Sequence, residues 1–176
     1  MKLLNYPEFR QTYIWDCGAK AIQSVLVYYG IDVDEADIMK YAKTNSRYGT
    51  SPENMIKVAE KYELEIDAKE MKIVELKKYL DEKIPVVLLL QAWPKHKVKN
   101  WKEHWKHSHY AVAIGYDKSK IYFEDPYAIN RTYLTEKELK DRWHGMYNSS
   151  QKHYNWGLAV FGKKPDYSAN KIIHMN

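Results

Sequence analysis

A continuous apolar run, Val86-Val87-Leu88-Leu89-Leu90, constrains the fold more than any other feature of this sequence. It follows Pro85, and proline is tolerated at the start of a strand, where its missing N–H is not needed. A strand that is apolar on both faces must be covered on both faces. The run therefore predicts an interior strand in a layered domain.

Amphipathic segments that predict helices lie mostly before this run. Apolar residues recur at helical spacing from Ile22 to Tyr29, which predicts a helix over 17–29 that stops at Gly30. Further helices are expected over 34–42, from Pro52 to about 62, over 73–82, and from a capping box at 135–138 to about 143. Thr50 and Glu53 also have capping-box spacing before the third helix.

The remaining strands are expected over 63–68, 109–116, 120–124 and 156–161, with loops over 94–108 and 147–154. Helices that precede most of the strands predict an α+β fold, in which an N-terminal helical half packs on an antiparallel sheet. The chain has 176 residues. We expect one domain over 1–162 and a C-terminal tail over 163–176.

Charge and cysteine content exclude several classes of protein. The net charge is +5, and the segment from Lys95 to His107 holds five lysines and one glutamate, hence +4 of it. No nucleic-acid motif accompanies these lysines, so we expect no nucleic-acid partner. The segment is expected to be a loop over a cleft that grips an acidic or hydrophobic substrate. The single cysteine, Cys17, excludes an internal disulfide or a cysteine-based zinc site.

Other sequence features predict whether the protein binds a metal, spans a membrane or is secreted. His104, His107 and His109 lie close together in the sequence, as metal ligands often do. His109 is better suited to act as a base, and the other two lie on no clear helix or strand. No metal or cofactor is therefore expected. No run of 18 or more apolar residues is present, so no membrane-spanning segment is expected. The first residues lack the apolar stretch of a secretory signal, which predicts a cytoplasmic location.

Cys17 stands at the expected first turn of a helix, where the peptide dipoles place partial positive charge. That field favours a thiolate over a thiol, and the free backbone N–H groups there could hold an oxyanion. Gly18 has no Cβ and would let a substrate approach the backbone. Gln11 could supply a second oxyanion donor, and Asp16 is expected to cap the helix. An inert core thiol is the alternative.

A base and an orienting acid follow later in the chain. His109 opens an expected strand, and Asp125 lies at the end of the next strand. Facing residues of a hairpin have a constant sum of positions, and 109 + 125 is even. The two side chains share a face only if the numbers of directly paired residues also add up to an even sum. We therefore predict an odd loop or a β-bulge in this hairpin.

The ordered motifs Gln-x5-Cys-Gly, His-Tyr-x-Val-x-x-Gly and Asp-Pro-Tyr resemble those of the bacteriocin-processing peptidases, papain-like cysteine peptidases numbered family thirty-nine. Gly49-Thr50 and the segments 85–93 and 133–143 add to the resemblance, which covers about 5–162. Such enzymes often form the N-terminal domain of peptide exporters and cut leader peptides after paired glycines. Because this chain has no membrane spans or nucleotide-binding domain, we expect a stand-alone member of the looser group of peptidases that are similar to this family.

The resemblance implies a papain-like fold with Cys17 as nucleophile, His109 as general base, Asp125 as orienting acid and Gln11 as oxyanion donor. It implies a cysteine peptidase acting on a peptide or protein, such as a leader- or pro-peptide processing protease. Two other classes stay open. One is an acyltransferase or deamidase with the same thioester chemistry, and the other is a non-catalytic peptide-binding module.

Overall fold

The computed structural model of the chain describes residues 2–175. Met1 and Asn176, the outer ends of the predicted domain and tail, lie outside the described residues. The helices are α1 (Cys17–Tyr28), α2 (Glu35–Tyr41), α3 (Pro52–Lys61), α4 (Ile73–Asp81) and α5 (Glu136–Arg142), with a 3-10 turn at Trp101–Glu103. The strands are β1 (Lys2–Leu3), β2 (Glu65–Glu70), β3 (Val86–Gln91), β4 (Ser108–Tyr116), β5 (Lys120–Glu124), β6 (Thr132–Thr135), β7 (His144–Tyr147), β8 (Gln151–Tyr154) and β9 (Trp156–Phe161).

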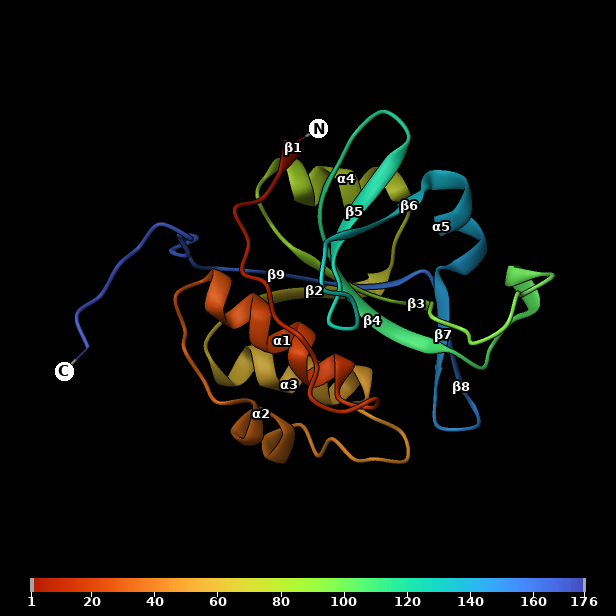
Figure 1. The fold of residues 1–176 in the computed structure, drawn as a ribbon, viewed down its shortest axis with the longest axis horizontal. Coiled ribbons are helices and arrows are strands. Elements are labelled where there is room, and N and C mark those ends of the chain that lie inside the picture. The colour runs from red at the N-terminus through yellow and green to blue at the C-terminus, as the bar shows by residue number, and fades with distance from the viewer. Residues whose placement is uncertain (1, 176) are drawn as a thin grey trace.

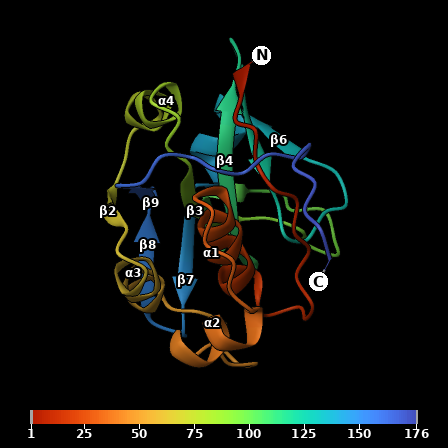
Figure 2. The same ribbon diagram turned by 90° about the vertical axis from the view of Figure 1, so that its left-hand side faces the viewer.

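Antiparallel strands in the order β2-β9-β3-β4-β5-β6 form the main sheet, and β1 pairs with β4. Helices α1, α2 and α3 gather on one side of this sheet and α4 and α5 on the other (Figure 1). In the perpendicular view α1 lies in front of β3 and β4 (Figure 2). These layers confirm the predicted α+β architecture, with a helical half on an antiparallel sheet.

Strand β3 is buried along its whole length, as the apolar run predicts. Val87 and Leu89 face the core shared with α1 and α3, whereas Leu88 and Leu90 face the core shared with α4 and α5. Burial of a side chain of this size contributes about 1.5–3 kcal/mol. The strand therefore ties both layers together and gives β4, its neighbour, a rigid support.

Two local predictions are wrong. Residues 147–154 were expected to be a loop, but β7 and β8 form a hairpin there. The third helix is capped by Ser51, whose hydroxyl accepts from the Asn54 N–H, and not by Thr50. The Thr50 hydroxyl instead bonds to the Thr44 hydroxyl at 2.8 Å. The capping box at Thr135 is confirmed, because its hydroxyl accepts from the Glu138 N–H and the Glu138 carboxylate accepts from the Thr135 N–H.

The β4–β5 hairpin contains the predicted β-bulge. Near the turn Tyr116 pairs with Ile121, an odd sum of positions, but beyond a register shift between Ala113 and Gly115 the partners are Val112 and Glu124, an even sum. One extra residue in β4 thus changes the parity. Side chains at odd positions on the two strands then share a face near the open end of the hairpin.

Residues 163–175 contain no helix or strand, and they extend away from the sheet (Figure 1). Their beginning is attached to α1, since the backbone N–H groups of Asp166 and Tyr167 both donate to the Tyr28 carbonyl. Tyr167 also packs against the core. Among the described residues, no helix is long and apolar enough to cross a membrane.

Candidate active site

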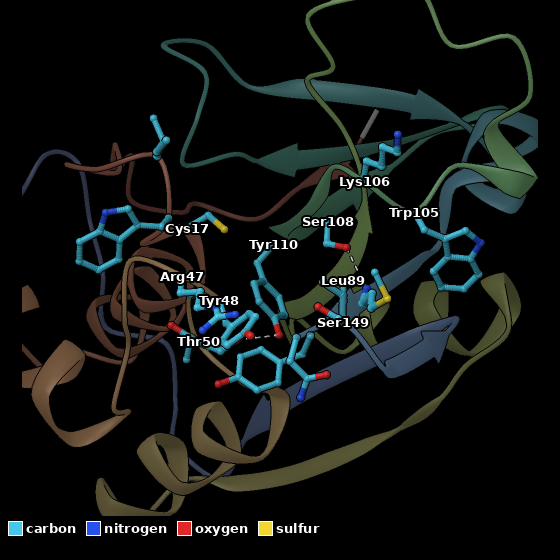
Figure 3. A pocket seen from close by; sticks show the side chains of 16 residues that line it. Cys17, Arg47, Tyr48, Thr50, Leu89, Trp105, Lys106, Ser108, Tyr110 and Ser149 are labelled. Carbon is cyan, nitrogen blue, oxygen red and sulfur yellow. Dashed lines mark hydrogen bonds between the residues drawn. The ribbon is translucent and has the colours of Figure 1, made fainter.

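Cys17 is the first residue of α1 and is half-buried. Its side chain borders a cavity of about 620 Å³, with Tyr110 and Ser108 on the opposite side (Figure 3). The first N–H groups of a helix have no acceptor within the helix. The thiol therefore combines access from a cavity with nearby free backbone donors, unlike an inert core thiol.

His109 lies on β4, and Asp125 directly follows β5. The His109 Nε2 and Asp125 Oδ1 atoms are 2.7 Å apart, and the two side chains are only 8% and 5% exposed. The bulge produces this contact, because in the even register Asp125 lies diagonally across from His109 on the same face. Continued in its odd register, the hairpin would direct Asp125 to the opposite face.

Asp125 is held by further donors. Its Oδ1 also accepts from the Tyr127 N–H at 3.0 Å, and its Oδ2 accepts from Trp93 Nε1 at 3.1 Å and from the Thr132 hydroxyl at 3.3 Å. The Trp93 and Tyr127 rings stack over this region with centroids 5.0 Å apart. Hydrogen bonding to His109 lowers the pKa of Asp125 although burial opposes it. A carboxylate with these bonds is fixed in orientation and stays ionised.

The His109 ring joins the acid to the cysteine. Burial lowers the pKa of His109, but hydrogen bonds to Asp125 and to the Cys17 side chain outweigh burial and raise it to about 10. Because Nε2 faces Asp125, Nδ1 is the ring nitrogen that remains for an interaction with Cys17. An imidazolium held by a buried carboxylate is stable at neutral pH in this arrangement. The structure therefore brings together three of the four predicted site residues.

Gln11, the fourth residue, borders a second cavity of about 900 Å³ together with His109. Its Nε2 donates to the Tyr13 carbonyl at 2.6 Å, while its buried Oε1 has no partner among the described residues. Exchanging the two amide atoms would set an oxygen against that carbonyl, so the assigned orientation is the favourable one. Among the described residues, the Tyr13 carbonyl is the one acceptor found for Gln11 Nε2, which leaves its second proton unpaired.

Asp16 occupies the N-cap position of α1 as predicted, but its side chain makes no capping hydrogen bond. Its Oδ2 accepts from the backbone N–H groups of Thr12 and Tyr13 at 3.0 and 2.8 Å, which folds the segment before the helix back on itself. Asp16 thereby shapes the loop that carries Gln11. Burial raises the pKa of Asp16 although these N–H bonds oppose it, and the charge of Glu35 adds to the increase.

Gly18 serves packing and not substrate access. A Cβ at this position would lie 2.8 Å from the Thr50 Cβ and 3.1 Å from the Tyr110 Cδ2. The absent side chain lets the first turn of α1 approach the strand that carries His109. The Tyr110 hydroxyl donates to the Thr50 carbonyl at 3.1 Å, which fixes this contact (Figure 3).

Glu124, the residue before Asp125, connects the end of β5 to the N-terminal segment of the chain. It is buried, and its Oε1 accepts from the Phe9 N–H at 2.9 Å. Burial raises the pKa of Glu124 to about 7, although the Phe9 bond opposes the increase. Folding therefore shifts Glu124 toward its protonated form.

We expect this group to make stability depend on pH. The pKa of Glu124 in the folded protein lies above its unfolded value of 4.5. The contribution of Glu124 to the free energy of unfolding is therefore complete below about pH 4.5 and is lost as pH rises through about 7. The wild-type protein should lose up to about 3 kcal/mol of its free energy of unfolding in this way. Glu124→Gln keeps the acceptor for the Phe9 N–H and removes the charge, so this loss should be absent from the variant. Urea unfolding of both proteins at pH 4.5 and pH 8 measures the difference. An identical decrease in the two proteins would contradict the prediction.

Two histidines of the 94–107 segment, His104 and His107, bond to each other. His104 Nε2 and His107 Nδ1 are 2.7 Å apart, and the rings stack. Within residues 2–175, no group of three or more histidine, cysteine or acidic side chains is placed to hold a metal ion. The prediction of a loop before β4 is confirmed, apart from the 3-10 turn.

A cysteine at a helix start, next to an imidazole that a buried carboxylate orients, is the arrangement of a cysteine hydrolase. The helical layer on an antiparallel sheet places the chain among papain-like folds. The model of the peptidase C39 family matches residues 5–153, and the chain belongs to this family. By membership it is a cysteine-type peptidase.

Solved structures show the same fold. A C39-like peptidase from Bacillus anthracis matches with a TM-score of 0.70 and 17% identity, over 94% of this chain and 100% of that one. The peptidase domain of Streptococcus ComA, a bifunctional ABC transporter involved in quorum sensing, gives 0.67 and 20%, over 88% and 97%. A double glycine motif protease from an AMS/PCAT transporter, in complex with a leader peptide, gives 0.65 and 21%, over 93% and 94%. No protein of curated function matches significantly.

Proposed function

We propose that the protein hydrolyses peptide bonds through an acyl-enzyme on Cys17, with His109 as base and acid and Asp125 as the orienting group. One observation carries the proposal. The His109 ring bonds to the buried Asp125 carboxylate and is within hydrogen-bonding reach of the Cys17 side chain, which borders an open cavity. An imidazolium beside a thiolate is the reactive form for attack on an amide.

In the first half-reaction, the Cys17 thiolate attacks the amide carbonyl carbon and forms a C–S bond, and the carbonyl electron pair moves to oxygen. The backbone N–H of Cys17 and the side-chain amide of Gln11 donate to this oxyanion. The C–N bond then breaks, and the proton on His109 Nδ1 passes to the leaving nitrogen. The result is a thioester and a free amine.

In the second half-reaction, neutral His109 removes a proton from water, and the hydroxide attacks the thioester carbonyl. The C–S bond breaks, the acid product leaves, and the thiolate–imidazolium pair is restored. Asp125 stays ionised throughout and keeps Nε2 protonated. Atoms and charge balance without a metal or cofactor.

The relative that is bound to a leader peptide supports a peptide as substrate. We propose a leader- or pro-peptide for this chain as well, because an extended peptide fits the two cavities of about 620 and 900 Å³ that share Ile14, Lys106 and Ser108. A peptide bond placed at this junction would lie beside Cys17 and His109, each of which borders one of the two cavities.

Incubation with a proteome-derived peptide library tests the function. Fragments that appear with the wild-type protein and not with Cys17→Ala support a peptidase. A mass change without cleavage would assign an acyltransferase or deamidase. Reaction of Cys17 with iodoacetamide no faster than a free thiol, together with no product, would assign a non-catalytic binding module.

Gln11→Ala is expected to lower kcat about 10²-fold with a small effect on KM, because an oxyanion donor acts mainly in the transition state. Its backbone N–H still donates to the Pro126 carbonyl in the variant, so the loop stays attached. Steady-state kinetics on the best-cleaved library peptide measures the effect. Gln11→Glu, of similar size, serves as a control that cannot donate when ionised. A purely KM-based effect in Gln11→Ala would contradict the role.

A further inference from the structure

The segment 94–107, called here the basic loop, connects β3 to β4 and presents unpaired cations. Lys95, Lys97, Lys99 and Lys106 are all exposed. In the part of the chain that the structure describes, none of the four has an ion-pair partner, whereas Lys102 pairs with Asp141. The unpaired lysines are thus available to a ligand.

The basic loop is attached firmly at its base. The Ala92 N–H donates to the His107 carbonyl, and the His107 N–H donates to the side chain of buried Gln91. Gln91 Nε2 in turn donates to the His144 carbonyl. These bonds fix the two ends of the basic loop against β3 and β7, so its lysines differ from a run of charges on a free tail.

All four unpaired lysines border the same cavity as His109. Glu103 is the one acidic residue among the side chains that line it. The Cys17 cavity has no acidic residue in its lining and shares Lys106, which Figure 3 shows at its edge. A cavity with cations on its walls concentrates anionic ligands.

The proposed chemistry gives a direction to a peptide across the two cavities. The acyl part of the substrate stays on Cys17, and the leaving nitrogen takes its proton from His109. The part of the peptide that follows the cleaved bond therefore runs past His109 into the larger cavity. Its side chains meet the lysines of the basic loop.

We propose that the basic loop selects substrates with aspartate or glutamate among the first few residues after the cleaved bond. This inference rests on the proposed peptidase function and adds a specificity to it. Lys95, Lys97 and Lys99 are the specificity-determining residues. Their attraction to carboxylates is partly screened at physiological ionic strength, so the selection weakens as salt rises.

The aromatic residues of the loop favour a peptide over a single-stranded nucleic acid. Trp101 lies under the Arg142 guanidinium at 3.8 Å, and Trp105 packs against His144 with centroids 4.4 Å apart. These rings are engaged within the protein, whereas binding of single strands depends on free rings on which bases stack. Beside the loop, the exposed rings of Trp93 and Tyr127 also border the cavity, but they stack on each other.

Binding of product-like peptides to Cys17→Ala tests the proposal without turnover. The first probe is a fluorescent short peptide with a free N-terminal amine and alternating Asp and Glu at its second to sixth positions. The second carries Asn and Gln at the same positions. At low ionic strength, fluorescence anisotropy should give about tenfold tighter binding of the acidic probe.

The variant Lys95→Glu/Lys97→Glu/Lys99→Glu, made in Cys17→Ala, should lose or invert this preference. Lys57→Glu/Lys78→Glu/Lys163→Glu makes the same change in net charge at exposed lysines that border neither cavity, and it should keep the preference. The same lysine variants are also made with Cys17 intact and incubated with the peptide library. Fragments from the wild type and from the control variant should be enriched in acidic residues after the cleaved bond. Fragments from the loop variant should show no such enrichment.

Equal binding of the two probes by Cys17→Ala would overturn the proposal, as would equal loss of preference in the two lysine variants. Tighter binding of an oligothymidylate than of the acidic probe would assign the loop to nucleic acid instead. Absence of cleavage in the library, with the probe preference intact, would contradict the peptidase function alone.

Discussion

Replacement of Cys17 by alanine is expected to lower peptide turnover by at least about 10⁵-fold while the fold is retained. The sulfur is the sole atom at this position that can form the acyl-enzyme, and the chain has one cysteine. The helix start should survive, because alanine has the highest helix propensity and the side chain is half-buried. Loss of activity would then report chemistry and not unfolding.

The measurement is kcat/KM for the best-cleaved library peptide, with thermal unfolding of both proteins as the test of folding. Iodoacetamide should label the wild-type protein at position 17 and leave Cys17→Ala unlabelled. Cys17→Ser is a matched control, since it keeps the size and polarity of the side chain with a poorer nucleophile. Activity of Cys17→Ala near the wild-type level would remove the basis of the proposed mechanism.

Much of the site follows from local patterns in the sequence. The position of Cys17 at a helix start depends on the apolar spacing from Ile22 to Tyr29, which is a strong signal over about two turns. The meeting of His109 and Asp125 depends on the parity of one hairpin, and this requires a bulge or an odd loop. Periodicity and counting are enough for both, because the elements are adjacent in the chain.

Long-range contacts of the site could not be predicted in this way. Asp16 resembles a helix cap by position, but its carboxylate bonds backward to Thr12 and Tyr13, a choice between two local partners that the sequence leaves open. The bonds from Trp93 and Thr132 to Asp125 join segments that only the folded sheet brings together. No local pattern marks either residue as part of the site.

The β7–β8 hairpin was missed for a different reason. Its second strand, Gln151–Tyr154, is largely exposed and polar, so it lacks the alternation of apolar residues that predicts a strand. The first strand is fixed by packing, since a Cβ at Gly145 would lie 2.4 Å from the Leu89 Cγ. This close approach to β3 becomes visible only in three dimensions.

Asp125 is expected to contribute both orientation and charge to His109, and two substitutions separate them. Asp125→Ala removes the acceptor for Nε2 and the negative charge, and kcat should fall by about 10³-fold or more. Asp125→Asn keeps an oxygen that accepts from Nε2 and removes the charge, at the cost of the acceptor for Trp93 Nε1. The imidazolium would keep its orientation, and kcat should fall by about tenfold.

The pH profile distinguishes this role from simple packing. In the wild type burial lowers the pKa of His109, but the bonds to Asp125 and Cys17 raise it to about 10, so activity should be lost on the basic side as pH rises through about 10. Without the Asp125 charge the pKa of His109 falls, and the basic limb of kcat/KM against pH should move to lower pH in Asp125→Asn. A structural role alone would lower activity at every pH equally. An unshifted basic limb in Asp125→Asn would therefore contradict the proposed charge effect, because the neutral amide leaves nothing to hold the imidazolium above its ordinary pKa except the thiolate.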